Sequence, residues 1–319
     1  MKSELRQANF SLKKIEKQQG IFLCQPNFLR AANVIGNYFS APIGQVLKSL
    51  IPIDILNNPE LLSKKNICPP SDESELKNEN LIIQEPNEDR LSIYKGLIRE
   101  SFAKKESIFL MIPTALDIDF YKNYLEKGID KYTYAFSSKM KSKEIVEKWK
   151  KALSAKEPIL IIATPSFLSI PRQDIKTIIV EKESSDTYKQ ISRPLLDFRK
   201  VAILIAKEEK KRLIFGDLAL RTETIYYLAK KEYYPLSPPK YRSFSSAKQI
   251  LIDLTEENQK ENILSQEISS IVKNINNEKK SKFFILNNRR GLSSVIYCRD
   301  CGQIRKLSLI HISEPTRPY

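Results

Sequence analysis

The stretch Thr177–Gln190, TIIVEKESSDTYKQ, carries the strongest fold signal in this sequence. It opens with Ile178–Val180, a run of β-branched apolar residues that is typical of a strand buried on both faces of a parallel sheet. Charged residues follow at once, and the stretch ends in Tyr188-Lys189-Gln190. Because open α/β sheets bind ligands at the carboxyl ends of their strands, we expect a site here. Taken alone, the stretch would equally fit a solvated turn after a core strand.

The sequence around this stretch alternates between helical patterns and short apolar strands. We predict strands at Ser107–Ile112, Tyr132–Phe136, Ile159–Ala163, Ile175–Val180 and Arg212–Phe215. Helices are predicted at Arg90–Lys104, Leu116–Glu126, Lys141–Ala155, Leu195–Lys207 and Leu220–Lys231. Such alternation indicates βαβ units, so residues 89–235 are expected to form one α/β lobe with a parallel sheet.

The flanking segments have a different character. Pro26 opens a helical pattern, and a second short helix carries Val46, Leu47 and Leu50. Residues 52–88 are rich in proline and polar side chains and are interpreted as a linker after a separate segment 1–51. The Pro-rich Tyr234–Arg242 is interpreted as a hinge, and residues 236–306, which include most of it, are expected to begin a second lobe.

The composition favours a cytoplasmic protein with a polyanionic partner. The 319 residues have a formal net charge of +15 and a pI near 9.4, which favours nucleic acid, although a generally Lys-rich proteome would give the same excess. The sequence has no apolar run of membrane-spanning length and no signal-peptide core, so no membrane partner is expected. Four cysteines in a chain of this length indicate a reducing compartment rather than a disulfide framework.

Several motifs occur in the order and spacing of one known family. Glu181-Lys182-Glu183-Ser184 is followed by Tyr188-Lys189-Gln190 and then by Pro194 and Arg199, with Ala163-Thr164-Pro165-Ser166 upstream. Near the end stand Asn288-Arg289-Arg290-Gly291 and Cys298-x-x-Cys301-Gly302, and near the start Tyr38-Phe39-x-x-Pro42-x-Gly44-x-Val46-Leu47. On these residues the chain resembles the primosomal protein N-prime family, which are replication-restart DNA helicases of superfamily two.

The resemblance implies a RecA-like parallel-sheet helicase lobe, a small N-terminal remnant of a DNA-end-binding region (1–51) and the start of a second lobe. It implies forked or single-stranded DNA as a partner, together with replication-restart and single-strand-binding proteins. ATP and magnesium are the family's cofactors, and zinc is held by cysteine pairs. Carried onto this sequence, the DNA-binding candidates are Tyr188, Lys189, Gln190, Arg199, Arg289 and Arg290.

The motif that binds ATP in the family departs strongly from the pattern. Residues Gln84–Leu91 replace a Gly-rich loop that ends in Gly-Lys-Thr, and they contain no glycine. Backbone N–H groups of such a loop must approach the phosphates closely, and Pro86 has no N–H to donate. Arg90 could replace the charge of the lysine, but Leu91 cannot hold magnesium. The sequence therefore predicts that this loop does not bind ATP.

The acidic box is degenerate in the same way. Glu181 could still hold magnesium, Lys182 replaces the second acid with a cation, and the side chain of Glu183 should point to the other face of the strand end. The family's third motif, Gly-Ser-Ala-Thr, reads Gly216–Ala219, GDLA, and has lost both hydroxyls. We therefore assign no catalytic residue and expect that the fold persists without ATP hydrolysis.

The end of the sequence gives half of a zinc site. Cys298 and Cys301 have zinc-ligand spacing, but no further cysteine follows them, so a site needs ligands from elsewhere. Leu307–Tyr319 does not resemble the family and is interpreted as a non-native tail on a longer natural protein. His311, the single histidine, lies in that tail and is not a candidate.

Three functions remain open at this point. The first is a DNA-binding, helicase-like protein of replication restart that has lost ATP hydrolysis. The second is an active ATP-dependent DNA helicase with divergent motifs. The third is a non-enzymatic scaffold for replication proteins, which would show neither ATPase activity nor salt-sensitive DNA binding.

Overall fold

The computed structural model describes residues 25–58 and 79–238, and the short pieces 250, 268–272, 284, 296–297 and 304–305. The chain separates into two units, Met1–Ser243 and Phe244–Tyr319. In the second unit β8 (Ile296–Tyr297) pairs antiparallel with β9 (Ile304–Arg305). The first unit contains the seven-stranded sheet. Among the described residues, no helix has the length and apolar character needed to cross a bilayer.

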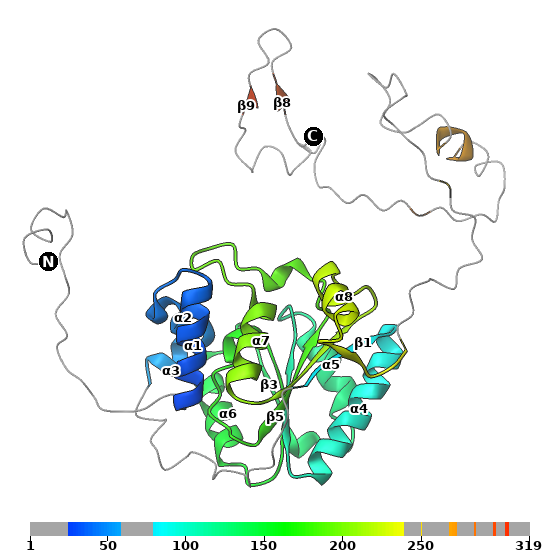
Figure 1. Ribbon diagram of the computed structural model, residues 1–319. Helices are drawn as coiled ribbons and strands as arrows, with labels where there is room; N and C mark the ends of the chain where they lie inside the picture. The colour runs from blue at the N-terminus through cyan, green and yellow to red at the C-terminus, as the bar shows by residue number, and fades with distance from the viewer. Residues whose placement is uncertain are drawn as a thin grey trace, which may run out of the picture. The chain divides into compact units, whose positions relative to one another are not determined.

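The first unit is built on a seven-stranded sheet whose strands are all parallel (Figure 1). Its order is β3-β4-β2-β5-β6-β1-β7, which places β5 (Ile175–Glu181) at the centre. The other strands are β1 (Asn80–Gln84), β2 (Ser107–Met111), β3 (Thr133–Phe136), β4 (Leu160–Ala163), β6 (Arg212–Asp217) and β7 (Tyr234–Pro235). The predicted α/β fold with a parallel sheet and a central strand at Ile178–Val180 is therefore confirmed.

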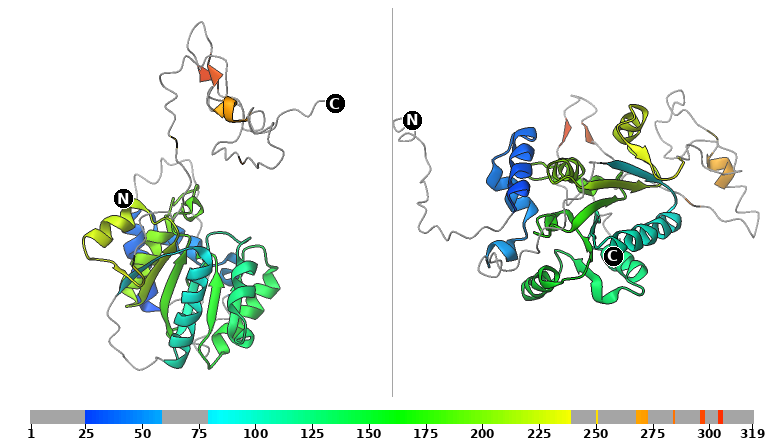
Figure 2. Two further views of the ribbon diagram at one scale, coloured as in Figure 1. Left: turned by 90° about the vertical axis from the view of Figure 1, so that its right-hand side faces the viewer. Right: turned by 60° about the horizontal axis from the view of Figure 1, so that its bottom comes forward.

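Helices cover both faces of the sheet, as Figure 2 shows for α1 and α4 on opposite sides. The helices are α1 (Pro26–Tyr38), α2 (Ile43–Leu50), α3 (Ile53–Leu56), α4 (Asn87–Ala103), α5 (Ile118–Leu125), α6 (Ser142–Ser154), α7 (Phe198–Glu208) and α8 (Thr222–Ala229). Successive strand side chains point to opposite faces, so the sheet separates two apolar cores. Ile179 packs in the core under α4 and α5, and its neighbours Ile178 and Val180 pack in the other core.

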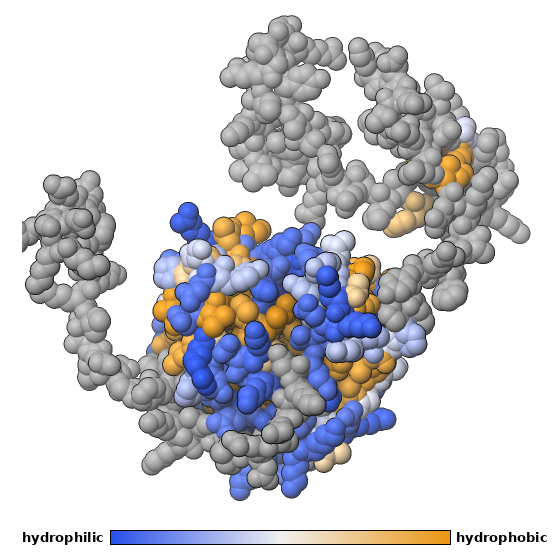
Figure 3. Space-filling view, viewed as in Figure 1, coloured by the Kyte–Doolittle hydropathy of each residue, from blue (hydrophilic) through white to orange (hydrophobic). Residues whose placement is uncertain are grey.

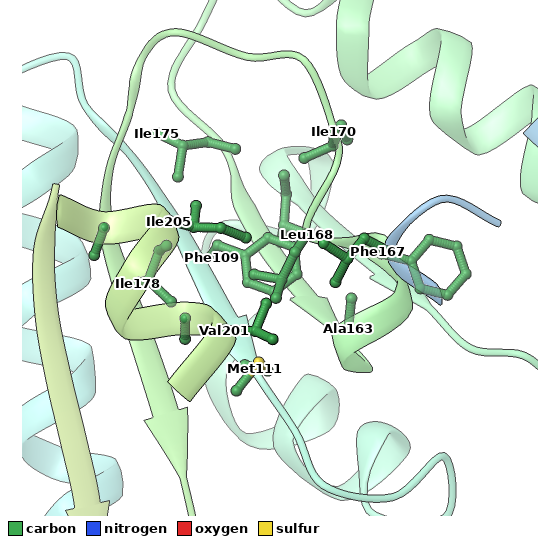
Figure 4. Close-up of a cluster of buried hydrophobic side chains, with 14 of the residues drawn as sticks. Phe109, Met111, Ala163, Phe167, Leu168, Ile170, Ile175, Ile178, Val201 and Ile205 are labelled. Carbon is green, nitrogen blue, oxygen red and sulfur yellow. The ribbon is translucent and has the colours of Figure 1, made fainter. Parts of the chain in front are cut away.

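The core on the α7 face explains why β5 reads as a continuous apolar run. Val201 and Ile205 of α7 lie against Ile178 of β5 and against Phe109 and Met111 of β2 (Figure 4). All five side chains are at most 1% exposed. Both faces of β5 are thus covered, and every position of the strand from Thr177 to Glu181 is buried.

Two predicted boundaries are wrong. The range 52–88 was expected to be a linker, but it contains β1, which pairs between β6 and β7. The apolar run that forms this strand is only Leu81–Ile83, too short to stand out among proline and polar residues. Helices α1–α3 pack in the same core as α6 and α7, so residues 25–56 belong to the first unit instead of standing apart from it.

This shared core gives the first prediction. Ile35 of α1 is 0% exposed, and truncating it to alanine should lower the free energy of unfolding by about 2–5 kcal/mol, as for a buried core residue. Ile205→Ala in α7 should have an effect of the same size, and both variants should unfold in one transition. Ile53→Ala is the control, because Ile53 is 55% exposed. An Ile35→Ala variant as stable as the wild type in urea denaturation would contradict the shared core.

Candidate functional site

The carboxyl end of β5 places Glu181 at the centre of a buried polar network. Its side chain is 0% exposed and points toward α4 and α5. Its carboxylate accepts hydrogen bonds from the hydroxyl of Tyr94 (2.5 Å) and the hydroxyl of Tyr121 (2.7 Å). The guanidinium of Arg90 forms a salt bridge with the same carboxylate, with Nε at 3.3 Å from Oε2 and Nη2 against Oε1. Both carboxylate oxygens therefore have two partners each within the chain.

Arg90 reaches Glu181 from the first turn of α4. The guanidinium is 3% exposed and also donates to the backbone carbonyl of Glu85 (2.6 Å) and to Oδ1 of Asn87 (3.4 Å). The sequence suggested Arg90 as a substitute for the lysine of an ATP-binding loop. The structure places its charge against Glu181 instead, where it neutralises a buried carboxylate. Loss of either partner would leave the other charge buried without compensation, which is unfavourable for the folded state.

The ionisation of the network is fixed by burial and by the charge of Glu181. Burial raises the pKa of Tyr94 and of Tyr121, and the neighbouring Glu181 carboxylate raises both further. Burial by itself would lower the pKa of Arg90, but the hydrogen bond and the charge of Glu181 outweigh it and raise that pKa. Both tyrosines therefore stay neutral donors near neutral pH, and Arg90 stays a cation.

The connection between β1 and α4 is very short. β1 ends at Gln84 and α4 begins at Asn87, which leaves only Glu85 and Pro86 between them. The first turn of α4 carries two acids, Glu88 and Asp89, which oppose an anion at the positive end of a helix. A phosphate-binding loop instead wraps several backbone N–H groups around the phosphates. Among the described residues, the connection between β1 and α4 is too short to form such a loop.

Lys182 and Glu183, the other two charged residues of the acidic box, each have partners of their own. Lys182, in the left-handed region at φ 51°, is 40% exposed in its side chain and its Nζ lies 3.2 Å from Oδ1 of Asp117. Glu183 is buried at the start of α8, where its carboxylate accepts from the backbone N–H of Arg221 (2.9 Å) and the hydroxyl of Thr224 (2.7 Å). Burial raises the pKa of Glu183. Glu183 therefore contacts α8, whereas Lys182 lies at the start of α5, with its Nζ 5.8 Å from the centre of the Tyr121 ring.

The expected DNA contacts of Tyr188 and Arg199 are wrong. Tyr188 is 0% exposed, and its hydroxyl donates to the backbone carbonyls of Met111 (3.0 Å) and Glu181 (2.7 Å). Arg199 is 1% exposed, pairs with Asp197 (2.8 Å) and donates to the backbone carbonyl of Glu183 (2.7 Å). Tyr188 ties the segment after β5 to the sheet, and Arg199 ties the same segment to the start of α7. Both side chains are buried in these roles, so neither is accessible to a base or a phosphate.

The other candidates of that motif lie at the surface. Lys189 is exposed, with its Nζ 3.8 Å from Oδ1 of Asp186, and the half-buried Gln190 lies beside it. Together with Ile191, which is 97% exposed, they line a shallow hollow in the segment that precedes α7. DNA contacts of Lys189 and Gln190 stay a prediction.

The candidates near the chain's end fall outside the described residues. These are Arg289, Arg290, Cys298 and Cys301. Within the parts of the chain that the structure describes, no three His, Cys, Asp or Glu side chains converge in a way that could hold a metal ion.

Sequence reasoning missed the two tyrosines and the glycine that complete the network. Tyr94 and Tyr121 lie on apolar helix faces, where an aromatic residue is usually read as core. Gly216 of β6 faces them, and a Cβ atom built on it would lie 1.9 Å from the hydroxyl oxygen of Tyr94. The missing side chain therefore makes room for the hydrogen bond between Tyr94 and Glu181.

The second prediction follows from this close approach. Gly216→Ala should destabilise the protein, and adding Tyr94→Phe should recover part of the loss because it removes the overlapping oxygen. Their interaction energy in a double-mutant cycle should be favourable by about 0.5–3 kcal/mol. Gly96→Ala is the matched control in α4, where a Cβ meets no atom within 4 Å and a stabilisation of about 0.5–1 kcal/mol is expected. Strict additivity in urea denaturation would show that Gly216 and Tyr94 do not compete for space.

Comparison with curated proteins gives a consistent set of relatives. The chain is 25% identical over 289 residues to the "Replication restart protein PriA" of Rickettsia prowazekii, which covers 84% of this chain and 44% of the relative. The PriA proteins of Buchnera aphidicola and Bacillus subtilis are 26% and 25% identical, and each match covers 72% of this chain. The match spans 32% of the Buchnera protein and 29% of the Bacillus protein. No protein-family model matches the chain.

Two solved helicase structures overlap with parts of the fold. An XPD helicase has a TM-score of 0.31 and 12% identity, covering 50% of this chain and 35% of its own. The DUF1998 helicase MrfA has a TM-score of 0.35 and 10% identity, covering 70% and 33%. Structural matches with TM-scores this low carry no argument about function. The curated relatives, in contrast, are the same proteins that the sequence motifs indicated. The chain therefore resembles the replication restart protein PriA as a divergent relative, and it spans less than half the length of the PriA proteins that it matches.

Proposed function

We propose that this chain is a DNA-binding, helicase-like protein of replication restart whose first α/β lobe does not hydrolyse ATP. The similarity to PriA proteins and the order of the motifs support the helicase-like part of this proposal. Forked or single-stranded DNA is then the principal partner, with replication-restart and single-strand-binding proteins as further partners. Zinc would enter only with ligands in addition to Cys298 and Cys301.

The observation that carries the second part is the salt bridge between Arg90 and Glu181. Magnesium requires near-octahedral oxygen ligands at about 2.0–2.1 Å, so Glu181 would have to exchange partners before it could serve as one. The guanidinium would then remain beside a dication. Two like unit charges 4 Å apart repel by about 4 kcal/mol at an effective dielectric of 20, and a dication doubles that value.

The residues around Glu181 also lack the other parts that phosphoryl transfer uses. That chemistry depends on a phosphate cradle, a bound metal ion and a residue that orients the attacking water. Lys182 is a cation in the place of the orienting acid, and Glu183 is held by Arg221 and Thr224 at the start of α8. The two-residue connection between β1 and α4 leaves no cradle. ATP and magnesium are therefore not proposed as cofactors of this lobe.

Two alternatives remain to be separated by experiment. An active ATP-dependent helicase would hydrolyse ATP in the presence of forked DNA. A scaffold for replication proteins would neither hydrolyse ATP nor bind DNA in a salt-dependent way. The PriA relatives favour the two DNA-binding functions over the scaffold, and the buried network favours binding without hydrolysis over the active helicase.

The third prediction is that 5 mM ATP with 10 mM magnesium will not raise the melting temperature of the full chain. A ligand at a hundred times its dissociation constant would stabilise the folded state by about 2.7 kcal/mol, which a thermal-shift measurement resolves easily. A single-stranded oligonucleotide at low salt serves as the comparison and should raise the melting temperature. A magnesium-dependent shift with ATP, accompanied by DNA-stimulated phosphate release, would establish the active helicase instead.

A further inference from the structure

We propose that a lysine-lined groove between α5 and α6, beside the end of β3, binds the phosphate backbone of single-stranded DNA. This inference rests on the proposed function, because it names the surface through which DNA binding would occur. Neither the acidic box nor the Tyr188 segment contributes to it. We call this surface the lysine groove; it is lined by Lys122, Lys139, Lys141 and Lys148, with Asp119 and Glu144.

The groove and Glu181 both lie on the side of the sheet where the strands have their carboxyl ends. β3 is an edge strand, and Ser137 follows its last residue and lines the groove. Helix α5 lies in the core of one face, and α6 lies in the core of the other. Both helices begin on the side of the carboxyl ends of the strands, which is where open α/β sheets bind ligands. The groove thus has a position that suits a ligand.

The charge of the groove is only partly neutralised within the protein. Lys148 pairs with Glu144 at 3.0 Å and Lys122 pairs with Glu126 at 3.5 Å, both as neighbours on their own helices. Lys139 and Lys141 are exposed, and no acidic side chain of the described residues lies within 4 Å of either ammonium group. Their two charges are therefore available to an external anion.

The surroundings of the groove extend the same charge along α6. The segment 139–151, KMKSKEIVEKWKK, holds six lysines and two glutamates. Lys143, Lys150 and Lys151 are exposed. In the view of Figure 3 the surface around α6 is mainly hydrophilic. A cationic strip next to a groove suits a linear polyanion better than a compact ligand, because counterions are released along its whole length.

Nucleic acid is favoured over an acidic protein segment by the composition of the strip. Protein interfaces concentrate aromatic residues and arginine and are depleted of lysine at their centre. The groove instead presents lysines and has no aromatic side chain in its lining. Lysine ammonium groups act as point charges toward phosphate and carry no base preference. The expected binding is therefore independent of sequence and strongly dependent on salt.

The test compares three forms of the full 319-residue chain: the wild type, Lys139→Gln/Lys141→Gln and the control Lys105→Gln/Lys156→Gln. Lys105 and Lys156 are also exposed and have no ion pair among the described residues, but they precede β2 and β4 and so lie at the opposite edge of the sheet. The measurement is the affinity for a fluorescent 20-nucleotide oligo-dT across a series of NaCl concentrations, together with the melting temperature.

Loss of two phosphate contacts should lower the slope of log affinity against log salt by about 1.4 in the groove variant. The control should keep the wild-type slope, and all three melting temperatures should agree because the four lysines are exposed.

An equal loss of slope in both variants would overturn the groove in favour of diffuse attraction. An unchanged slope in the groove variant would overturn it outright while leaving the proposed function intact. Absence of oligo-dT binding by the wild type would refute the proposed function itself. Binding of poly-glutamate that depends on Lys139 and Lys141, without oligo-dT binding, would assign the groove to an acidic protein.

Discussion

The buried pair of Arg90 and Glu181 is the interaction on which the arrangement of this lobe depends. It joins the first turn of α4 to the end of the central strand, and the hydroxyls of Tyr94 and Tyr121 complete the coordination of the carboxylate. Two helices on one face of the sheet are thereby fixed at the edge where a ligand would otherwise enter. A buried pair need not add much net stability, but removal of one partner leaves a charge in a dry environment. The pair therefore constrains what the site can do more than it strengthens the fold.

Much of the fold could be predicted from the sequence because the signals are local. Alternation of apolar strands with helical patterns indicated βαβ units, and Ile178–Val180 marked a strand covered on both faces. β1 was missed because its apolar run spans only Leu81–Ile83, and its place in the sheet depends on pairing with distant strands β6 and β7. The docking of α1 and α2 was missed for the same reason, since their apolar faces do not specify which surface they will meet.

The site could be predicted only in part. The sequence pointed to the degenerate acidic box, and strand periodicity put Glu183 on the opposite face from Lys182. It did not predict that Glu183 turns away from Glu181, which follows because β5 ends at Glu181 and Lys182 adopts the left-handed region at φ 51°. It could not show that Arg90 turns inward, since an arginine beside a strand end fits a phosphate ligand and a buried carboxylate equally well. Tyr188 and Arg199 were assigned to DNA because they match the family's motif. Their burial follows from the path of the chain after β5, which no local pattern reveals.

The central claim is that Arg90 and Glu181 are one internal unit, and a double-mutant cycle tests it most directly. The free energies of unfolding in urea would be measured for the wild type, Arg90→Met, Glu181→Gln and the double variant. Removing Arg90 alone should destabilise the protein by about 3–5 kcal/mol, because the carboxylate stays buried. The double variant should lose less than the sum of the single variants, by about 1–3 kcal/mol. Additive losses, or an Arg90→Met variant as stable as the wild type, would contradict the account.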